Sequence, residues 1–87
     1  MIDILRKKLL YRSAHRGCKE MDLLLSSFVK ENLENLSIDE TIELESLLSE
    51  NELEIKKWIV ERIDIPLKYE VIINKINIFN QEHILDR

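Results

Sequence analysis

The chain has one glycine and one proline among its 87 residues, and this shortage of turn residues limits the folds open to it. β-Hairpins depend on turns built from Gly, Asn-Gly and similar pairs. Long stretches rich in Leu, Glu, Lys and Ile favour helices instead. A chain of this length forms one small domain with a thin core. We therefore predict an all-α fold, a small five-helix bundle in a single domain, with its core in residues 3–80 and a frayed C-terminal tail.

The first two helices are delimited by charges and by the single glycine. A helix over residues 3–15 has basic residues in its last turn and is followed by Gly17. Cations favour the negative end of the helix dipole, and glycine accepts the left-handed conformation that ends many helices. The second helix then begins with Glu20 and Asp22, because acids are favoured in a first turn.

The starts of the other three helices are predicted from residues typical of helix N-termini. Ser37 with Glu40 three positions later is a capping box, in which each side chain accepts the other's backbone N–H. Asn51 can cap a fourth helix in the same way, with Glu54 at the corresponding position. Pro66 suits the first turn of a fifth helix, where its missing N–H would have no partner in any case.

Apolar residues recur at helical spacing along these segments. The predicted apolar faces are Ile2, Leu5, Leu9 and Tyr11; then Met21, Leu24, Leu25, Phe28 and Val29; then Ile38, Ile42 and Leu48, with Leu44 and Leu47 beside them; then Ile55, Trp58 and Ile59. Trp58 is predicted to lie in the core, where its indole N–H needs a partner.

The segment 69–79 carries two conflicting signals. Its Val and Ile residues are β-branched, which favours a strand. Tyr69, Ile72, Ile73 and Ile76 nevertheless match helical spacing, and no second strand is available for pairing. We interpret the segment as a helix.

Charge is distributed unevenly along the chain. Residues 1–20 carry six bases and two acids, whereas residues 31–55 carry nine acids and no base, and the formal net charge is −4. This balance argues against a general nucleic-acid binder, which would be basic. We interpret the acidic run as a solvated face, with a binding face for a basic partner as the alternative.

The sequence assembles no active site and no metal site. Cys18 is the single cysteine, which excludes an internal disulfide and a cysteine-based zinc site, and we interpret it as a structural thiol. His15 and His83 stand far apart, without ligands at metal-binding spacing. The longest apolar runs are far too short to cross a membrane.

The stretch from Arg16 to Glu20 differs from the rest. It contains the single glycine, and it carries opposite charges at positions i and i+4 around a helix junction. On physical grounds this is either a helix terminator with a surface ion pair, worth at most about 1 kcal/mol, or a binding site.

With this stretch in view, the chain resembles the succinate dehydrogenase assembly factor family, whose members promote covalent flavin attachment to the flavoprotein subunit. The family signature R-G-x-x-E is present as Arg16, Gly17 and Glu20, followed by an acid at Asp22. The similarity spans residues 5–68. Further matching positions are Leu9–Leu10–Tyr11, Phe28, Leu33, Leu36–Ser37, Glu40, Leu47–Leu48, Trp58 and Pro66, and Asn51 stands where the family often has Asp. Lys8, His15 and Cys18 depart from the usual pattern.

The resemblance implies a five-helix bundle with no catalytic activity of its own. It implies that the chain binds the flavoprotein subunit of succinate dehydrogenase and favours the bond between a histidine of that subunit and the 8α carbon of FAD. It leaves the corresponding subunit of fumarate reductase open as a second client. The flavin supplies the chemistry, and no cofactor is assigned to this chain. We expect a partner-binding surface without a metal, formed by Arg16, Gly17, Glu20, Asp22, Lys8 and Arg12.

Two other function classes stay open. One is an antitoxin-like or other protein-interaction module that uses the acidic run. The other is a small nucleic-acid binder that uses the Lys8–Arg12–Arg16 stripe, although we expect no nucleic-acid partner and no membrane insertion. The basic N-terminus resembles an organellar presequence, but it holds the signature residues, so we expect it not to be cleaved. We accordingly expect a bacterial cytoplasmic protein and regard the mitochondrial matrix as the weaker alternative.

Overall fold

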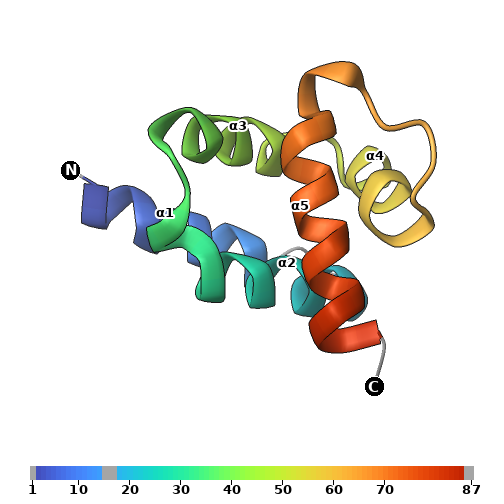
Figure 1. The fold of residues 1–87 in the computed structure, drawn as a ribbon, viewed down its shortest axis with the longest axis horizontal. Coiled ribbons are helices and arrows are strands. Elements are labelled where there is room, and N and C mark those ends of the chain that lie inside the picture. The colour runs from blue at the N-terminus through green and yellow to red at the C-terminus, as the bar shows by residue number, and fades with distance from the viewer. Residues whose placement is uncertain (1, 15–17, 86–87) are drawn as a thin grey trace.

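The fold is a bundle of helices, described here from a computed structural model that covers residues 2–14 and 18–85. The elements run in the order α1 (Ile2–Ala14), α2 (Lys19–Asn32), the 3₁₀ turn η1 (Leu33–Asn35), α3 (Ile38–Leu48), α4 (Glu52–Lys56), the π-helical turn η2 (Lys57–Glu61), the 3₁₀ turn η3 (Leu67–Tyr69), α5 (Glu70–Asn80) and the π-helical turn η4 (Gln81–Leu85). Figure 1 shows the arrangement. The described residues contain no strand, so the predicted all-α fold with five helices is confirmed.

Two helix starts form as their capping residues predict. The backbone N–H of Glu40 donates to Ser37 Oγ at 3.1 Å, and the Ser37 N–H donates to Glu40 Oε1 at 3.0 Å, which completes the capping box of α3. Asn51 Oδ1 accepts the Leu53 N–H at 2.8 Å at the start of α4. Each bond pairs a donor that the first turn of a helix otherwise leaves without a partner.

The last two helices differ in detail from the prediction. Pro66 is the N-cap of the turn η3, which leads into α5, and does not itself lie in the first turn of α5. Gln81–Leu85 follow α5 as a π-helical turn, and the fraying of residues 81–87 stays a prediction. The Phe79 ring stacks on the His83 ring in this turn, with centroids 4.5 Å apart, and this contact favours the helical continuation.

The corner after η2 uses left-handed backbone without glycine. Arg62 has a φ of 61° and Asp64 a φ of 53°. For a residue with a Cβ atom this conformation costs about 1–2 kcal/mol. The single glycine of the chain is Gly17, so this corner is formed by Arg62, which is poorly suited to it, and by Asp64, whose residue type tolerates it better.

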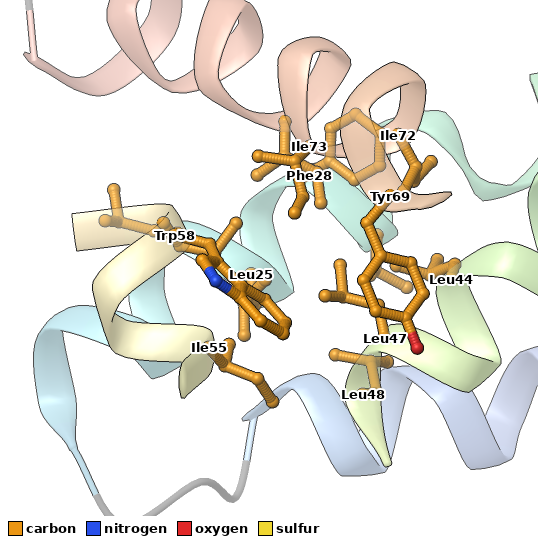
Figure 2. Close-up of a cluster of buried hydrophobic side chains, with 14 of the residues drawn as sticks. Leu25, Phe28, Leu44, Leu47, Leu48, Ile55, Trp58, Tyr69, Ile72 and Ile73 are labelled. Carbon is orange, nitrogen blue, oxygen red and sulfur yellow. The ribbon is translucent and has the colours of Figure 1, made fainter. Parts of the chain in front are cut away.

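The core is built around α2, which contacts α1, α5, η1 and η2. Its predicted stripe is fully confirmed, as are the buried positions predicted in α5, where packing overrides the strand preference of isoleucine. Figure 2 shows side chains from α2, α3, α4, η2 and α5 meeting in one cluster. The buried apolar residues are Leu9, Met21, Leu24, Leu25, Phe28, Val29, Leu33, Leu44, Leu47, Leu48, Ile55, Trp58, Ile59, Tyr69, Ile72, Ile73 and Ile76.

Two predicted faces need correction. Ile38 and Ile42 of α3 are 72% and 57% exposed, because the helix turns Leu44, Leu47 and Leu48 to the core instead. Tyr11 of α1 is also largely exposed. Trp58 is buried as predicted, but its indole N–H has no hydrogen-bond partner among the residues that the structure describes.

A polar link joins the start of α5 to the end of α3. The Tyr69 hydroxyl donates to Glu50 Oε2 at 2.5 Å and, with its own hydrogen so used, accepts from Ser46 Oγ at 2.8 Å. The hydrogen bond from Tyr69 lowers the pKa of Glu50 below its ordinary 4.5, and Lys68, 3.5 Å away, acts in the same direction. Burial first, and then the bond to Glu50, raise the pKa of Tyr69 above its ordinary 10.

We predict that Leu25→Ala lowers the free energy of unfolding by about 3 kcal/mol, because it removes a fully buried side chain and leaves a cavity. The matched control is Leu53→Ala, at a position that is 74% exposed, which should change it by less than about 0.5 kcal/mol. Urea unfolding followed by circular dichroism measures both. Similar losses in the two variants would contradict a core centred on α2.

We predict that Tyr69→Phe changes how stability depends on pH. Because the pKa of Glu50 is lowered in the folded state, its contribution is present above the ordinary pKa of 4.5 and is lost as the pH falls through the folded value. The stability gap between wild type and Tyr69→Phe should therefore narrow between pH 6 and pH 3. Urea midpoints at several pH values measure it, and Leu53→Ala, at an exposed position, serves as the control. A stability difference between wild type and Tyr69→Phe that stays constant over this pH range would show that the Tyr69–Glu50 bond does not contribute in this way.

Candidate functional site

The predicted binding residues lie around the connection between α1 and α2. Figure 1 shows these two helices side by side and running in opposite directions. Arg12 lies in the last turn of α1, with Lys8 one turn earlier, and Glu20 and Asp22 lie in the first turn of α2. The structure thus places Arg12, Glu20 and Asp22 at the connected end of a helical hairpin, with Lys8 at the middle of α1. Arg16 and Gly17, like His15, lie outside the described residues.

On the α1 side, Arg12 joins the junction to α3. Its Nη1 donates to Ser49 Oγ at 3.2 Å, and Ser49 is the C-cap residue of α3. Arg12 is half-buried, whereas Lys8 is exposed. Ser13 beneath them is buried, and its hydroxyl donates to the Leu10 carbonyl at 2.8 Å. The basic side of the site is therefore held by contacts that reach a third helix.

On the α2 side, Cys18 begins the helix. Its backbone is extended, and its carbonyl accepts the Asp22 N–H at 2.8 Å. The Cys18 side chain is half-buried against the core, as expected for a structural thiol. Glu20 is exposed, and Asp22 is half-buried. Both acids are at the positive end of the α2 dipole, which stabilises their charge.

Two exposed apolar residues adjoin these charges and were not predicted as part of the site. Leu23 is 53% exposed and follows Glu20 by three residues, which puts the two on one face of α2. Tyr11 stands in the same relation to Lys8 on α1. The sequence did contain a sign that Leu23 is exposed, because Leu23 falls outside the apolar stripe that α2 buries. Apolar side chains among charges are typical of protein–protein contact surfaces.

The acidic run is divided between structural and surface roles. Glu40 pairs with Lys75 of α5, and this hydrogen bond, followed by that from the Ser37 backbone, lowers the pKa of Glu40. Glu50 bonds Tyr69 as described above. The other seven acids are exposed or half-exposed. Two of the nine acids thus hold α3 against the start and middle of α5.

The arrangement suits recognition by charge and hydrogen bonding. The described residues contain no group of three His, Cys, Asp or Glu side chains placed to hold a metal ion. Among these same residues, no helix is long and apolar enough to span a bilayer. A guanidinium and carboxylates at the end of a hairpin can form charge-assisted hydrogen bonds with a partner.

We predict that Arg12→Ala lowers the free energy of unfolding by no more than about 1 kcal/mol, because its bond to Ser49 is exposed. Lys8→Ala, on the same helix, should change it even less. Urea unfolding measures both. A loss above about 2 kcal/mol for Arg12→Ala would make this side chain a structural element and remove it from the set of binding residues.

Comparison with known proteins gives consistent matches. The family described as "Flavinator of succinate dehydrogenase" matches residues 7–80. "Succinate dehydrogenase assembly factor 2, mitochondrial" of Dictyostelium discoideum is 37% identical over 75 residues, covering 86% of this chain and 53% of the relative. The protein of the same name from Komagataella phaffii is 40% identical over 63 residues, covering 72% of this chain and 33% of the relative.

A bacterial relative matches as well. "FAD assembly factor SdhE" of Acetobacter pasteurianus is 31% identical over 61 residues, covering 70% of this chain and 56% of the relative. The chain thus spans about half the length, or less, of curated relatives that it matches. No solved structure matches it.

Proposed function

The chain belongs to the family described as the flavinator of succinate dehydrogenase, and on that premise we propose that it binds the flavoprotein subunit of this enzyme and promotes covalent attachment of FAD. The membership confirms the resemblance drawn from the R-G-x-x-E signature. The observation that carries the proposal is the match over residues 7–80, which contains the whole signature. Relatives named as assembly factors for succinate dehydrogenase and for FAD support it.

We propose that the chain acts as an assembly factor and not as an enzyme. The family name describes help given to another protein. A small helical domain can give such help by binding one conformation of its client more tightly than the others. The reactive carbon belongs to the flavin, whose chemistry the client's own environment tunes. FAD is therefore assigned to the client and not to this chain.

The binding surface we propose consists of Arg16, Gly17, Glu20, Asp22, Lys8 and Arg12. The exposure of Glu20 and Lys8 supports it, since these charges are accessible to a partner. Arg12 can present a planar fork to a carboxylate or a carbonyl, which a lysine would do less well. The small Gly17 would permit close approach of two backbones. No observation favours the antitoxin-like or nucleic-acid-binding alternatives.

The matched relatives include mitochondrial proteins and a bacterial one. Their names support either compartment equally. The bacterial cytoplasm therefore stays a prediction, to be tested by locating the protein in cells of its source.

We predict that Arg16→Ala and Glu20→Ala leave the helical fold intact but sharply reduce covalent FAD on a co-expressed flavoprotein subunit. Truncating a desolvated charge at the centre of an interface typically costs about 2 kcal/mol, roughly thirty-fold in affinity. Covalent flavin survives denaturing electrophoresis, so its fluorescence in the gel reports the result directly.

The matched control is Glu54→Ala, another exposed glutamate near the start of a helix. It should leave the flavin fluorescence unchanged. Normal fluorescence with both test variants, at equal levels of both proteins, would disprove the proposed surface. Normal flavin attachment in cells that lack this chain altogether would disprove the proposed function.

A further inference from the structure

A groove with an aromatic ridge lies between the C-terminal half of α2 and the end of α5. Phe79 packs edge-on against the buried Phe28, with ring centroids 5.7 Å apart, and the His83 ring lies 4.5 Å from the Phe79 ring. A hollow of about 360 Å³ extends from Phe79 toward Phe28, Leu36 and Glu82. A second hollow, of about 320 Å³, is lined by Ser27, Glu31, Phe79 and His83. The two rings thus border two recesses.

This groove is separate from the α1–α2 junction. Glu31 and Glu20 are eleven residues apart on α2, which corresponds to about 16 Å along the axis of a helix. The residues that line the hollows come from α2, from η1 and its C-cap Leu36, from α5 and from η4. Glu20 and Asp22, at the other end of α2, do not line either hollow.

The charge of the groove is negative. Glu31 and Glu82 are both exposed, and neither has an ion-pair or hydrogen-bond partner among the residues that the structure describes. Lys75 borders the larger hollow, but its charge is matched by the ion pair with Glu40. Two carboxylates that line the same hollows as the Phe79 ring favour a cation, which such a ring attracts through its π-electrons.

We propose that this groove binds an arginine-bearing segment of the protein partner, which, on the proposed function, is the flavoprotein subunit. The guanidinium enters the smaller hollow, lies against the Phe79–His83 ring pair and donates to Glu31. An apolar neighbour of that arginine fills the larger hollow against Phe28 and Leu36. Arginine fits better than lysine, because its planar group both stacks on rings and forks onto a carboxylate.

The same charges disfavour other occupants. A second copy docked through this groove with two-fold symmetry would bring Glu31 and Glu82 toward their own counterparts. Like charges in such a contact repel one another. A membrane surface rich in anionic lipids is repelled for the same reason.

The first experiment measures the affinity of the purified chain for the flavoprotein subunit. We expect the double variant Glu31→Gln with Glu82→Gln to bind at least about ten-fold more weakly and to lose part of the salt dependence of binding. The control, Glu54→Gln with Glu61→Gln, removes the same charge from exposed positions elsewhere. Equal affinities of the two double variants would overturn the proposal. Circular dichroism verifies that both are folded.

A second experiment identifies the occupant and does not depend on the proposed function. The isotopically labelled chain is titrated with the peptide acetyl-Leu-Ala-Arg-amide and with its citrulline counterpart, a neutral isostere of the same shape. We expect the arginine peptide to shift the NMR signals of Phe79 and His83, and Glu31→Gln to weaken this effect. Equal shifts with the citrulline peptide, or no shift with either, would overturn the proposal.

The two experiments separate the two proposals. If the flavoprotein subunit does not bind the wild-type chain at all, the proposed function fails, and the peptide titration still decides whether the groove takes arginine. If the subunit binds and a photo-crosslinker at position 82 attaches to a subunit peptide that contains arginine, the groove is part of that interface. Attachment to a second copy of this chain, or to a subunit peptide without arginine, would overturn the proposal.

Discussion

The burial of one face of α2 is the constraint on which the rest of the molecule depends. The stripe from Met21 to Val29 supplies five of the buried apolar side chains, and α1, α5 and η2 all pack against this helix. Burying apolar surface is the main driving force available to a domain of this size. With one side fixed in the core, the ends of α2 are left to the surface. The signature acids stand at one end of this helix, and Glu31 at the other.

The parts of the fold that could be predicted are those governed by neighbours in sequence. The pair Ser37 and Glu40 needs only its own first turn to form a capping box, and the spacing of Ile72, Ile73 and Ile76 identifies a helix despite their branching. Ile38 and Ile42 were assigned to the core because they lie close to its true members on the helical circumference. Which of two adjacent sides of a helix is buried depends on where the neighbouring helices lie. The local sequence of α3 does not specify where they lie.

The same distinction applies to the candidate site. Arg16, Gly17 and Glu20 could be selected from the sequence, because a signature is a local pattern. The bond from Arg12 to Ser49 spans 37 residues, and that from Tyr69 to Glu50 spans 19, so no spacing rule predicts either of them. The aromatic groove escapes a sequence reading for the same reason. Its walls come from segments that meet only after α5 has packed across α2 (Figure 1).

The left-handed corner at Arg62 and Asp64 is a place where a substitution can still raise the stability of the protein. Neither residue belongs to the signature surface or to the aromatic groove. Substitution by glycine would relieve the backbone strain at this corner, since glycine adopts such backbone angles without a steric penalty. A lineage that alters its binding surfaces at some cost in stability can therefore recover that cost at a position outside both proposed surfaces. Adaptation to new clients and maintenance of the fold are in this way separable within a very short chain.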